Sequence, residues 1–220
     1  MAGTIALVGG AEWQEGCSFD AELLAQAGGE VLVLPTAAAY EHPDRAVATA
    51  ERWFSSIGGR ARGLMVLGRP DAEQEANAAA LRSSPFVYLG GGSPLHLRSV
   101  LKDSLVWDAL LDAWHGGAIV AGSSAGAMVL TDPMVDPRGG AFTIGLGLVE
   151  QLAVIPHAAT WSHEKVDRTL ALAPAGLPVA RIEERTALVR DPDGRWRIAG
   201  AGGVTVLVDG READLRALPG

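Results

Sequence analysis

The sequence predicts an α/β protein, a three-layer sandwich in which helices cover both faces of a mainly parallel β-sheet. Short apolar runs recur as far as Gly122, and most of them end at a glycine or a proline. Longer segments of helix-forming residues separate these runs, an alternation that is typical of parallel sheets. Beyond Thr186 the apolar runs become closely spaced, which predicts an antiparallel hairpin extension on the edge of the sheet.

Five apolar runs are the expected parallel strands. Each is apolar throughout instead of alternating with polar residues, as in strands that are buried on both faces. The runs cover residues 5–8, 31–34, 64–67, 86–89 and 118–121.

Four segments between the runs are the expected helices. They are free of internal glycine and proline or rich in Ala, Glu and Gln, and Pro43 suits the start of the first one. These segments cover residues 44–54, 71–81, 95–101 and 104–114.

The C-terminal extension is expected to contain strands at residues 186–189, 196–199 and 204–208, which are separated by Gly- and Asp-rich turns. We find no linker, domain boundary or internal repeat, so one domain over residues 1–220 is expected.

Composition excludes several classes of function. The formal net charge is −8, from 18 basic and 26 acidic residues, which disfavours nucleic acid as a partner. The single cysteine, Cys17, makes neither a disulfide nor a thiolate metal site. No signal peptide and no membrane-spanning run is recognisable, so a cytoplasmic protein without a membrane partner is expected.

The segment Gly122-Ser123-Ser124-Ala125-Gly126 matches the G-x-S-x-G nucleophile elbow. In this motif a serine lies on a sharp turn between a strand and a helix, and small neighbours allow the close approach that the turn needs. The apolar run before it and the sequence AMVL after it fit that context. Ser124 is therefore the candidate nucleophile, whereas an ordinary βα turn would be the structural alternative.

A glycine triplet, Gly90 to Gly92, closes the strand at residues 86–89. Acyl transfer needs two backbone N–H groups that face the developing oxyanion. Ala125, directly after the nucleophile, would supply one, and Gly91 or Gly92 the other. A phosphate-binding turn is the alternative, but neither a P-loop nor a dinucleotide fingerprint fits.

Five histidines are candidates for the base. His157 is favoured over His163 because it directly follows the apolar run at residues 152–156, and active sites of open α/β sheets form at the carboxyl ends of strands. Sequence spacing alone does not identify the carboxylate that orients the histidine. Its candidates are Asp132, Asp136, Glu150, Glu183 and Glu184.

These residues resemble the peptidase E and cyanophycinase family of serine peptidases, which share the class I glutamine amidotransferase-like fold. The resemblance covers nearly the whole chain. It rests on LVGGAE (7–12), LPTA (34–37), YLGGG (88–92), GSSAGA (122–127), GLGL (145–148), PH (156–157) and IEERTAL (182–188).

The resemblance implies Ser124 as nucleophile, His157 as base and an acid in the segment between them, with Asp136 first and Asp132 second. It also implies an oxyanion hole from the glycine triplet and Ala125. Glutamine amidotransferases have cysteine at the elbow, so the serine of this chain disfavours ammonia transfer.

Substrate residues are inferred where the chain departs from the family. Ser93 follows the triplet, where peptidase E usually has asparagine and cyanophycinases have glutamine. Trp161 follows His157 in place of an arginine-rich stretch. Ser93, Trp161 and Arg168 are the candidate substrate contacts, and Arg98 or Arg181 could also recognise an acidic side chain.

The expected function is hydrolysis of a small peptide or isopeptide bond next to an aspartyl residue, through an acyl-enzyme and without metal or cofactor. We leave open whether the chain forms a homodimer. The alternatives are a serine esterase and a non-catalytic amidotransferase-like module. The esterase of the α/β-hydrolase kind is disfavoured because no histidine follows His163.

Overall fold

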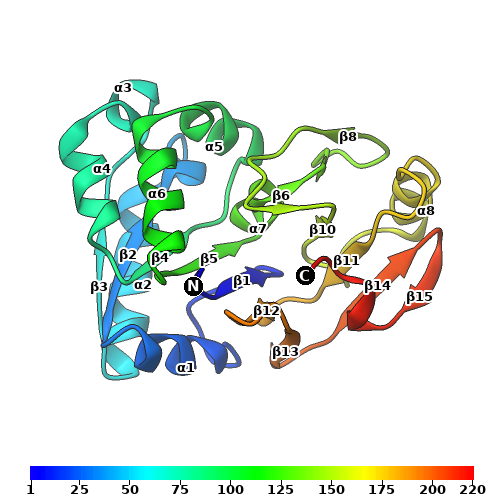
Figure 1. The fold of residues 1–220 in the computed structure, drawn as a ribbon, viewed down its shortest axis with the longest axis horizontal. Helices are drawn as coiled ribbons and strands as arrows, with labels where there is room; N and C mark the ends of the chain where they lie inside the picture. The colour runs from blue at the N-terminus through cyan, green and yellow to red at the C-terminus, as the bar shows by residue number, and fades with distance from the viewer.

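The computed structural model describes residues 1–220. Its two main β-sheets lie side by side, and most of the helices pack on the larger one (Figure 1). The larger sheet has seven strands in the order β13-β12-β1-β5-β4-β2-β3. Five of its strands are parallel. They are β1 (Ile5–Val8), β2 (Glu30–Leu34), β3 (Arg60–Gly63), β4 (Phe86–Leu89) and β5 (Ile119–Ser123). The predicted α/β class with a mainly parallel sheet is confirmed.

Each face of this sheet has its own hydrophobic core, because successive side chains of a strand point to opposite faces. Leu7 belongs to the core that packs beneath α3 to α7, and Val8 belongs to the core beneath α1 and α2. The helices are α1 (Phe19–Gln26), α2 (Pro43–Ser56), α3 (Arg69–Ala72), α4 (Glu75–Arg82), α5 (Pro94–Leu101), α6 (Leu105–His115) and α7 (Ala125–Leu130). This arrangement is the predicted three-layer sandwich.

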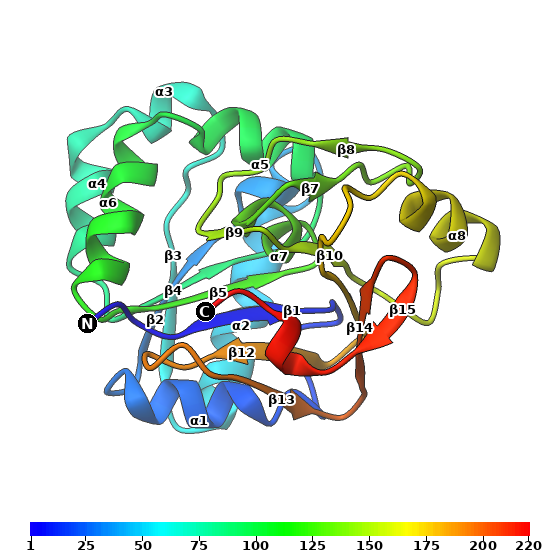
Figure 2. The same cartoon turned by 45° about the vertical axis from the view of Figure 1, so that its right-hand side comes forward.

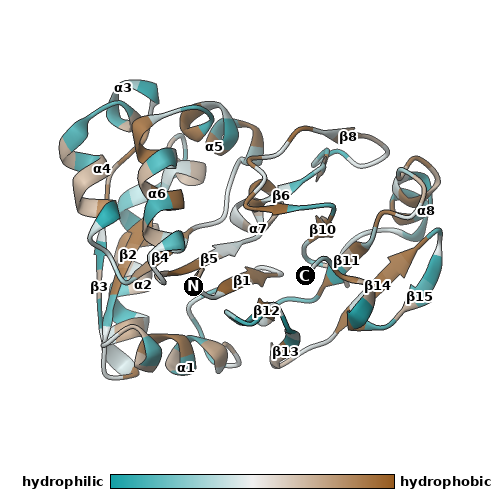
Figure 3. Ribbon diagram, in the orientation of Figure 1, coloured by the Kyte–Doolittle hydropathy of each residue, from teal (hydrophilic) through white to brown (hydrophobic).

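Hydropathy follows the layers. In Figure 3 the strands β1 and β2 are brown, whereas the helices carry teal residues on their outer sides. The predicted run at residues 64–67 is the exception, because the third strand is β3, the polar Arg60–Gly63 that precedes it. β3 lies at the edge of the sheet and is half exposed, so a continuous apolar run is not required there. Leu64 and Val66 are buried after the strand has ended.

The C-terminal extension is divided between the two sheets. β12 (Thr186–Arg190) and β13 (Trp196–Gly200) add an antiparallel hairpin to β1, as predicted. The third predicted strand, β14 (Val204–Val208), instead pairs with β11 (Val179–Ile182) of the smaller sheet. The chain leaves the larger sheet at Gly200, whose φ of +111° is a conformation that favours glycine.

The smaller sheet has the order β10-β11-β14-β15 and carries α8 (His163–Ala171) on the side away from α4 and α6 (Figure 2). Its outer members are β10 (Ala153–Ile155) and β15 (Arg211–Ala213). The run that precedes His157 therefore forms a strand, but in the smaller sheet and not in the larger one. The carboxyl ends of β10 and β11 lie next to that of β1, because the amides of His157 and Arg185 donate to the carbonyls of Gly9 and Gly10.

Short elements complete the chain. They are the 3₁₀ turns η1 (Thr36–Ala38) and η2 (Leu215–Ala217) and two strand pairs, β6 (Thr131–Asp132) with β9 (Val149–Glu150) and β7 (Met134–Val135) with β8 (Phe142–Thr143). None of the helices is both long and apolar enough to cross a membrane.

Candidate active site

Ser124 lies on the turn between β5 and α7. Its φ of +50° and ψ of −105° are strained for a residue with a side chain, and its amide donates to the carbonyl of Val8 at 2.9 Å. Strain of this kind persists only where the surrounding structure imposes it, and it concentrates at functional sites. The backbone geometry is that of a nucleophile elbow.

Steric contacts explain why both outer positions of the motif are glycine. A Cβ on Gly122 would lie 2.5 Å from the carbonyl carbon of Gly126, and a Cβ on Gly126 would lie 2.4 Å from the carbonyl oxygen of Leu89. Such contacts are too short for any side chain. The G-x-S-x-G spacing thus lets the first turn of α7 pack directly against β4 and β5.

His157 is next to the serine hydroxyl. Its Nε2 is 2.9 Å from Ser124 Oγ, and its own amide donates to Gly9 O at 2.7 Å. The imidazole is about one-third exposed, with 33% of its side-chain surface accessible, so a substrate can reach it. The structure therefore brings together the two residues that the sequence singled out as nucleophile and base.

The carboxylate beside this imidazole is Glu184, whose Oε1 is 2.7 Å from His157 Nδ1. Asp136, the first choice from the sequence, is instead held by the side chain of Arg138 at 2.7 Å and 2.9 Å, and this contact lowers the pKa of Asp136 to about 2. Asp132, the second choice, accepts a hydrogen bond from the amide of Gly145. The structure thus places Glu184, and neither of the two aspartates, against His157 Nδ1.

Glu184 reaches the site through the topology of the smaller sheet. It follows β11, which is the parallel neighbour of the strand that ends before His157. The adjacent Glu183 is directed elsewhere, and its Oε2 accepts the amide of Gly203 at 2.8 Å. The sequence left both glutamates open, and only the pairing of β10 with β11 distinguishes them.

The loop after β1 packs against the base. A Cβ on Gly10 would lie 2.2 Å from Cε1 of His157, and the carbonyl oxygen of Gly10 accepts the amide of Arg185 at 2.8 Å. Gly9 and Gly10 therefore fix the positions of both His157 and the segment that carries Glu184. In the sequence this loop is part of the LVGGAE match to the family, and no separate role was expected for it. A Gly-Gly pair directly after an apolar strand was the available signal.

We expect Gly10→Ala to lower kcat/KM by at least about 100-fold, because the added methyl group displaces the imidazole from Ser124 Oγ. The measurement is steady-state hydrolysis, with thermal unfolding as a check on the fold. Gly58→Ala is the matched control. Gly58 has a positive φ of +87°, as Gly10 does with +115°, but nothing lies within 4 Å of its Cβ position. This variant should therefore lose stability and keep its activity. Equal activity of the two variants would contradict the prediction.

Two segments with backbone N–H groups border Ser124. Ala125 is the first residue of α7, so the helix offers its amide no carbonyl acceptor. In the glycine triplet, Gly92 has a φ of +134° and its amide donates to no group within the chain. The amide of Gly91 differs from the expectation, since it already donates to Glu12 Oε1 at 3.0 Å.

The predicted substrate contacts have other partners. The hydroxyl of Ser93 caps α5 by accepting the amide of His96, and the ring of Trp161 lies 3.5 Å from Lys165 Nζ. Arg168 is 4.0 Å from Glu164 on the exposed side of α8. Arg181, in contrast, donates from its Nη2 to the carbonyl of Ala158, the residue after His157, at 3.1 Å, and its buried Nε has no acceptor.

Cys17 is not an alternative nucleophile at neutral pH. Burial raises the pKa of its thiol to about 11, and only the thiolate is strongly nucleophilic. His163, the second candidate base, begins α8. No three or more His, Cys, Asp or Glu side chains are grouped so that they could hold a metal ion.

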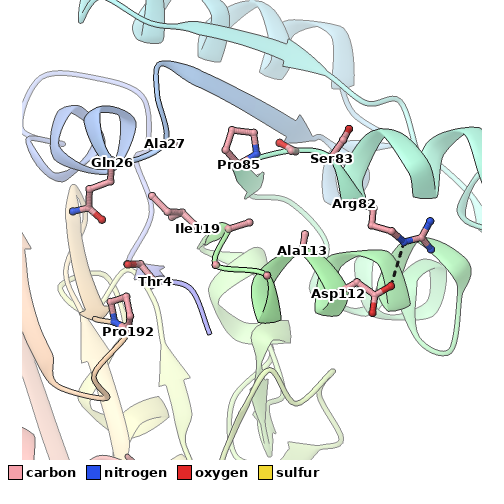
Figure 4. A pocket seen from close by; sticks show the side chains of 14 residues that line it. Thr4, Gln26, Ala27, Arg82, Ser83, Pro85, Asp112, Ala113, Ile119 and Pro192 are labelled. Atoms are coloured by element: carbon pink, nitrogen blue, oxygen red, sulfur yellow. Dashed lines mark hydrogen bonds and ion pairs between the residues drawn. The ribbon is translucent and has the colours of Figure 1, made fainter. Parts of the chain in front are cut away.

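A cavity of about 470 Å³ lies at the opposite edge of the larger sheet, where β1, β4 and β5 begin (Figure 4). Its lining includes Thr4, Pro85 and Ile119. The exposed ion pair of Arg82 with Asp112, in which Nε and Oδ2 are 3.2 Å apart, borders it. Ser124 follows the carboxyl end of β5, so this cavity takes no part in the site around the serine.

Known proteins resemble this chain in sequence. Residues 5–195 match the family model for peptidase family S51. The chain is 29% identical over 187 residues to the cyanophycinase of Synechococcus elongatus, covering 80% of this chain and 57% of that protein. It is 30% identical over 155 residues to the cyanophycinase of Trichormus variabilis, covering 66% of this chain and 52% of that protein. The chain thus spans little more than half the length of these relatives.

Solved structures extend the likeness to almost the whole chain. A peptidase from an acI-B1 actinobacterium superposes with a TM-score of 0.86 at 27% identity, covering 97% of this chain and 93% of that one. A protein described as peptidase E, from Listeria monocytogenes EGD-e, superposes with a TM-score of 0.66 at 17% identity, covering 94% of this chain and 99% of that one. The second likeness concerns the fold alone.

Proposed function

Because the chain belongs to peptidase family S51, we propose that it is a serine peptidase in which Ser124, His157 and Glu184 form a catalytic triad that hydrolyses small peptide or isopeptide bonds. The observation that carries the proposal is the relay from Ser124 Oγ to His157 Nε2 at 2.9 Å and from His157 Nδ1 to Glu184 Oε1 at 2.7 Å. An imidazole held between a hydroxyl and a carboxylate can accept the hydroxyl proton while the carboxylate stabilises the imidazolium.

The reaction proceeds in two halves. Ser124 Oγ forms a bond to the carbonyl carbon of the substrate while its proton moves to His157 Nε2. His157 then donates this proton to the leaving nitrogen, the C–N bond breaks, and the amine departs from an acyl-Ser124 ester. Water attacks the ester with His157 as the base, and the serine recovers its proton as the acid product leaves.

The negative oxygen of each tetrahedral intermediate needs preorganised donors. We assign this role to the amides of Ala125 and Gly92. Ala125 directly follows Ser124 and has no acceptor in α7, and Gly92 belongs to the triplet beside Ser124 and donates to no group within the chain. The Gly91 amide is committed to Glu12, so it is not assigned here.

A substrate with an acidic group beside the scissile bond fits the charges near His157. Arg181 has a buried Nε without an acceptor, next to the residue that follows the base. Because an unsatisfied buried donor is costly, an incoming carboxylate that reaches this guanidinium would be bound favourably.

A hydrolysis panel tests the proposal. It comprises dipeptides with Asp, Glu, Asn or Ala at the amino terminus and β-aspartyl isopeptides with the same second residue, with amine release measured for wild type and for Ser124→Ala. We expect cleavage of the aspartyl substrates and at least about tenfold slower cleavage of the Asn analogue, which lacks only the charge.

Two results would count against the proposal in different ways. Equal rates for Asp and Asn substrates would remove the acidic preference and leave the peptidase. If no substrate were cleaved and a fluorophosphonate probe did not label Ser124, the peptidase itself would be excluded and a non-catalytic module favoured.

A further inference from the structure

Glu12 lies beside the site but has no place in the triad or among the proposed oxyanion donors. We propose that it is a positioning residue, whose carboxylate holds the glycine triplet and the nucleophile elbow at a fixed separation. Its Oε1 accepts the amide of Gly91 at 3.0 Å and its Oε2 accepts the hydroxyl of Ser123 at 2.8 Å. One side chain thereby joins three segments that are far apart in the sequence.

Both of its partners directly precede functional groups. Gly91 precedes Gly92, one proposed oxyanion donor, and Ser123 precedes Ser124, whose successor Ala125 is the other. The segments are also close in space, since a Cβ on Gly91 would lie 3.6 Å from Ser124 Cβ. The two hydrogen bonds of Glu12, which we call the Glu12 clamp, therefore control the distance between the Gly92 and Ala125 amides, which must both reach the oxyanion.

A carboxylate suits this task because it only accepts hydrogen bonds, and each of its oxygens can take one of the two donors. Glu12 makes no ion pair, and these two uncharged groups are its hydrogen-bond donors. Hydrogen bonds to an ionised acceptor are stronger than neutral ones. Ser123 is fully buried, which shields its bond to Glu12 from competition by water.

The backbone around Glu12 is strained on both sides. Ala11 has a φ of +52° and Trp13 a φ of +60°, and neither is a glycine. Packing maintains this conformation, because Trp13 is buried against Tyr88 with ring centroids 5.2 Å apart, and Cys17 Sγ contacts Ala11 O. Strain on either side of one residue indicates that the direction of its side chain matters.

The test compares Glu12→Ala, Glu12→Gln, Ser123→Ala and the Glu12→Ala/Ser123→Ala double variant, with Glu15→Ala as the control. Glu15 is exposed on the same loop. The readouts are kcat and KM on the substrate cleaved best in the panel, the rate of Ser124 phosphonylation, and the amide chemical shift of Gly91 by NMR. The amide shift needs no activity, and it reports whether the bond to Glu12 is lost.

We expect Glu12→Ala to lower kcat by about 10- to 100-fold with KM changed less than about threefold, since displaced donors weaken binding of the transition state but not of the substrate. Glu12→Gln should stay within about fivefold of wild type, because its amide oxygen can accept from Gly91 while its NH₂ donates to Ser123 Oγ. Ser123→Ala should be intermediate, and the double variant no worse than Glu12→Ala. Glu15→Ala should match wild type.

Several outcomes would overturn the role of Glu12. One is a wild-type kcat in Glu12→Ala although the Gly91 amide shift has changed, and another is a loss in Glu12→Gln as large as that in Glu12→Ala. A third is a higher kcat in Glu12→Ala, which would mean that the carboxylate competes with the oxyanion for the Gly91 amide. If Glu12→Ala does not fold, Glu12→Gln and Ser123→Ala decide. The inference rests on the proposed function, yet the two fail differently. An inactive, unlabelled wild type ends the function, whereas an equally active Glu12→Ala ends only the clamp.

Discussion

Replacing Ser124 with alanine should lower kcat by about 10⁶-fold and abolish labelling by a fluorophosphonate, while the fold stays intact. The expectation follows from the geometry, because no other activated hydroxyl or thiolate is available beside His157. Cys17 is buried, and its raised pKa keeps the thiol neutral. Losing the nucleophile of a triad costs about as much as losing the whole triad, since the members act as one unit.

His157→Ala and the double variant complete this experiment. His157→Ala should lose nearly as much kcat as Ser124→Ala, and the double variant should lose no more than either single variant. Rates are measured at high enzyme concentration, with thermal unfolding as the control for the fold. Losses that multiply in the double variant would show that the 2.9 Å contact between the two side chains is not a catalytic relay.

Local signals in the sequence were sufficient for the inner strands of the larger sheet. Residues 5–8 and 86–89 were predicted as strands and are strands, because a run covered on both faces must be apolar along its whole length. The edge strand β3 escaped this pattern, since one of its faces meets solvent and its sequence is polar. The pairing of β10, β11 and β14 into a separate sheet could not be predicted, because these strands are far apart in the sequence and no local signal links them.

The same division holds for the site. Ser124 could be identified because it is the serine of a nucleophile-elbow motif that follows an apolar run. His157 could be identified because it directly follows the apolar run at residues 152–156. Glu184 and Glu12 could not, because a carboxylate acquires its role only from what the fold places beside it. Glu183 and Glu184 are adjacent in the chain and chemically identical, yet one contacts Gly203 and the other His157.

Glu184→Gln is expected to lower kcat by about 10⁴-fold, as the corresponding change of acid to amide does in a well-studied triad. The amide keeps the size and the position of the side chain, but it cannot stabilise the imidazolium. Its NH₂ group can also turn toward His157 Nδ1 and favour the tautomer that has its proton on Nε2. That tautomer cannot accept the proton of Ser124, so the loss should fall on kcat much more than on KM.

Two matched variants separate this role from a general effect of removing an acid. Glu183→Gln makes the same change one residue away, where the side chain accepts the Gly203 amide, and Asp136→Asn removes the acid that the sequence favoured. Both should keep kcat within about twofold of wild type. A loss in Asp136→Asn that approached that of Glu184→Gln would contradict the assignment, because the carboxylate of Asp136 is bound to Arg138 and could act only if the loop that carries it moved to His157.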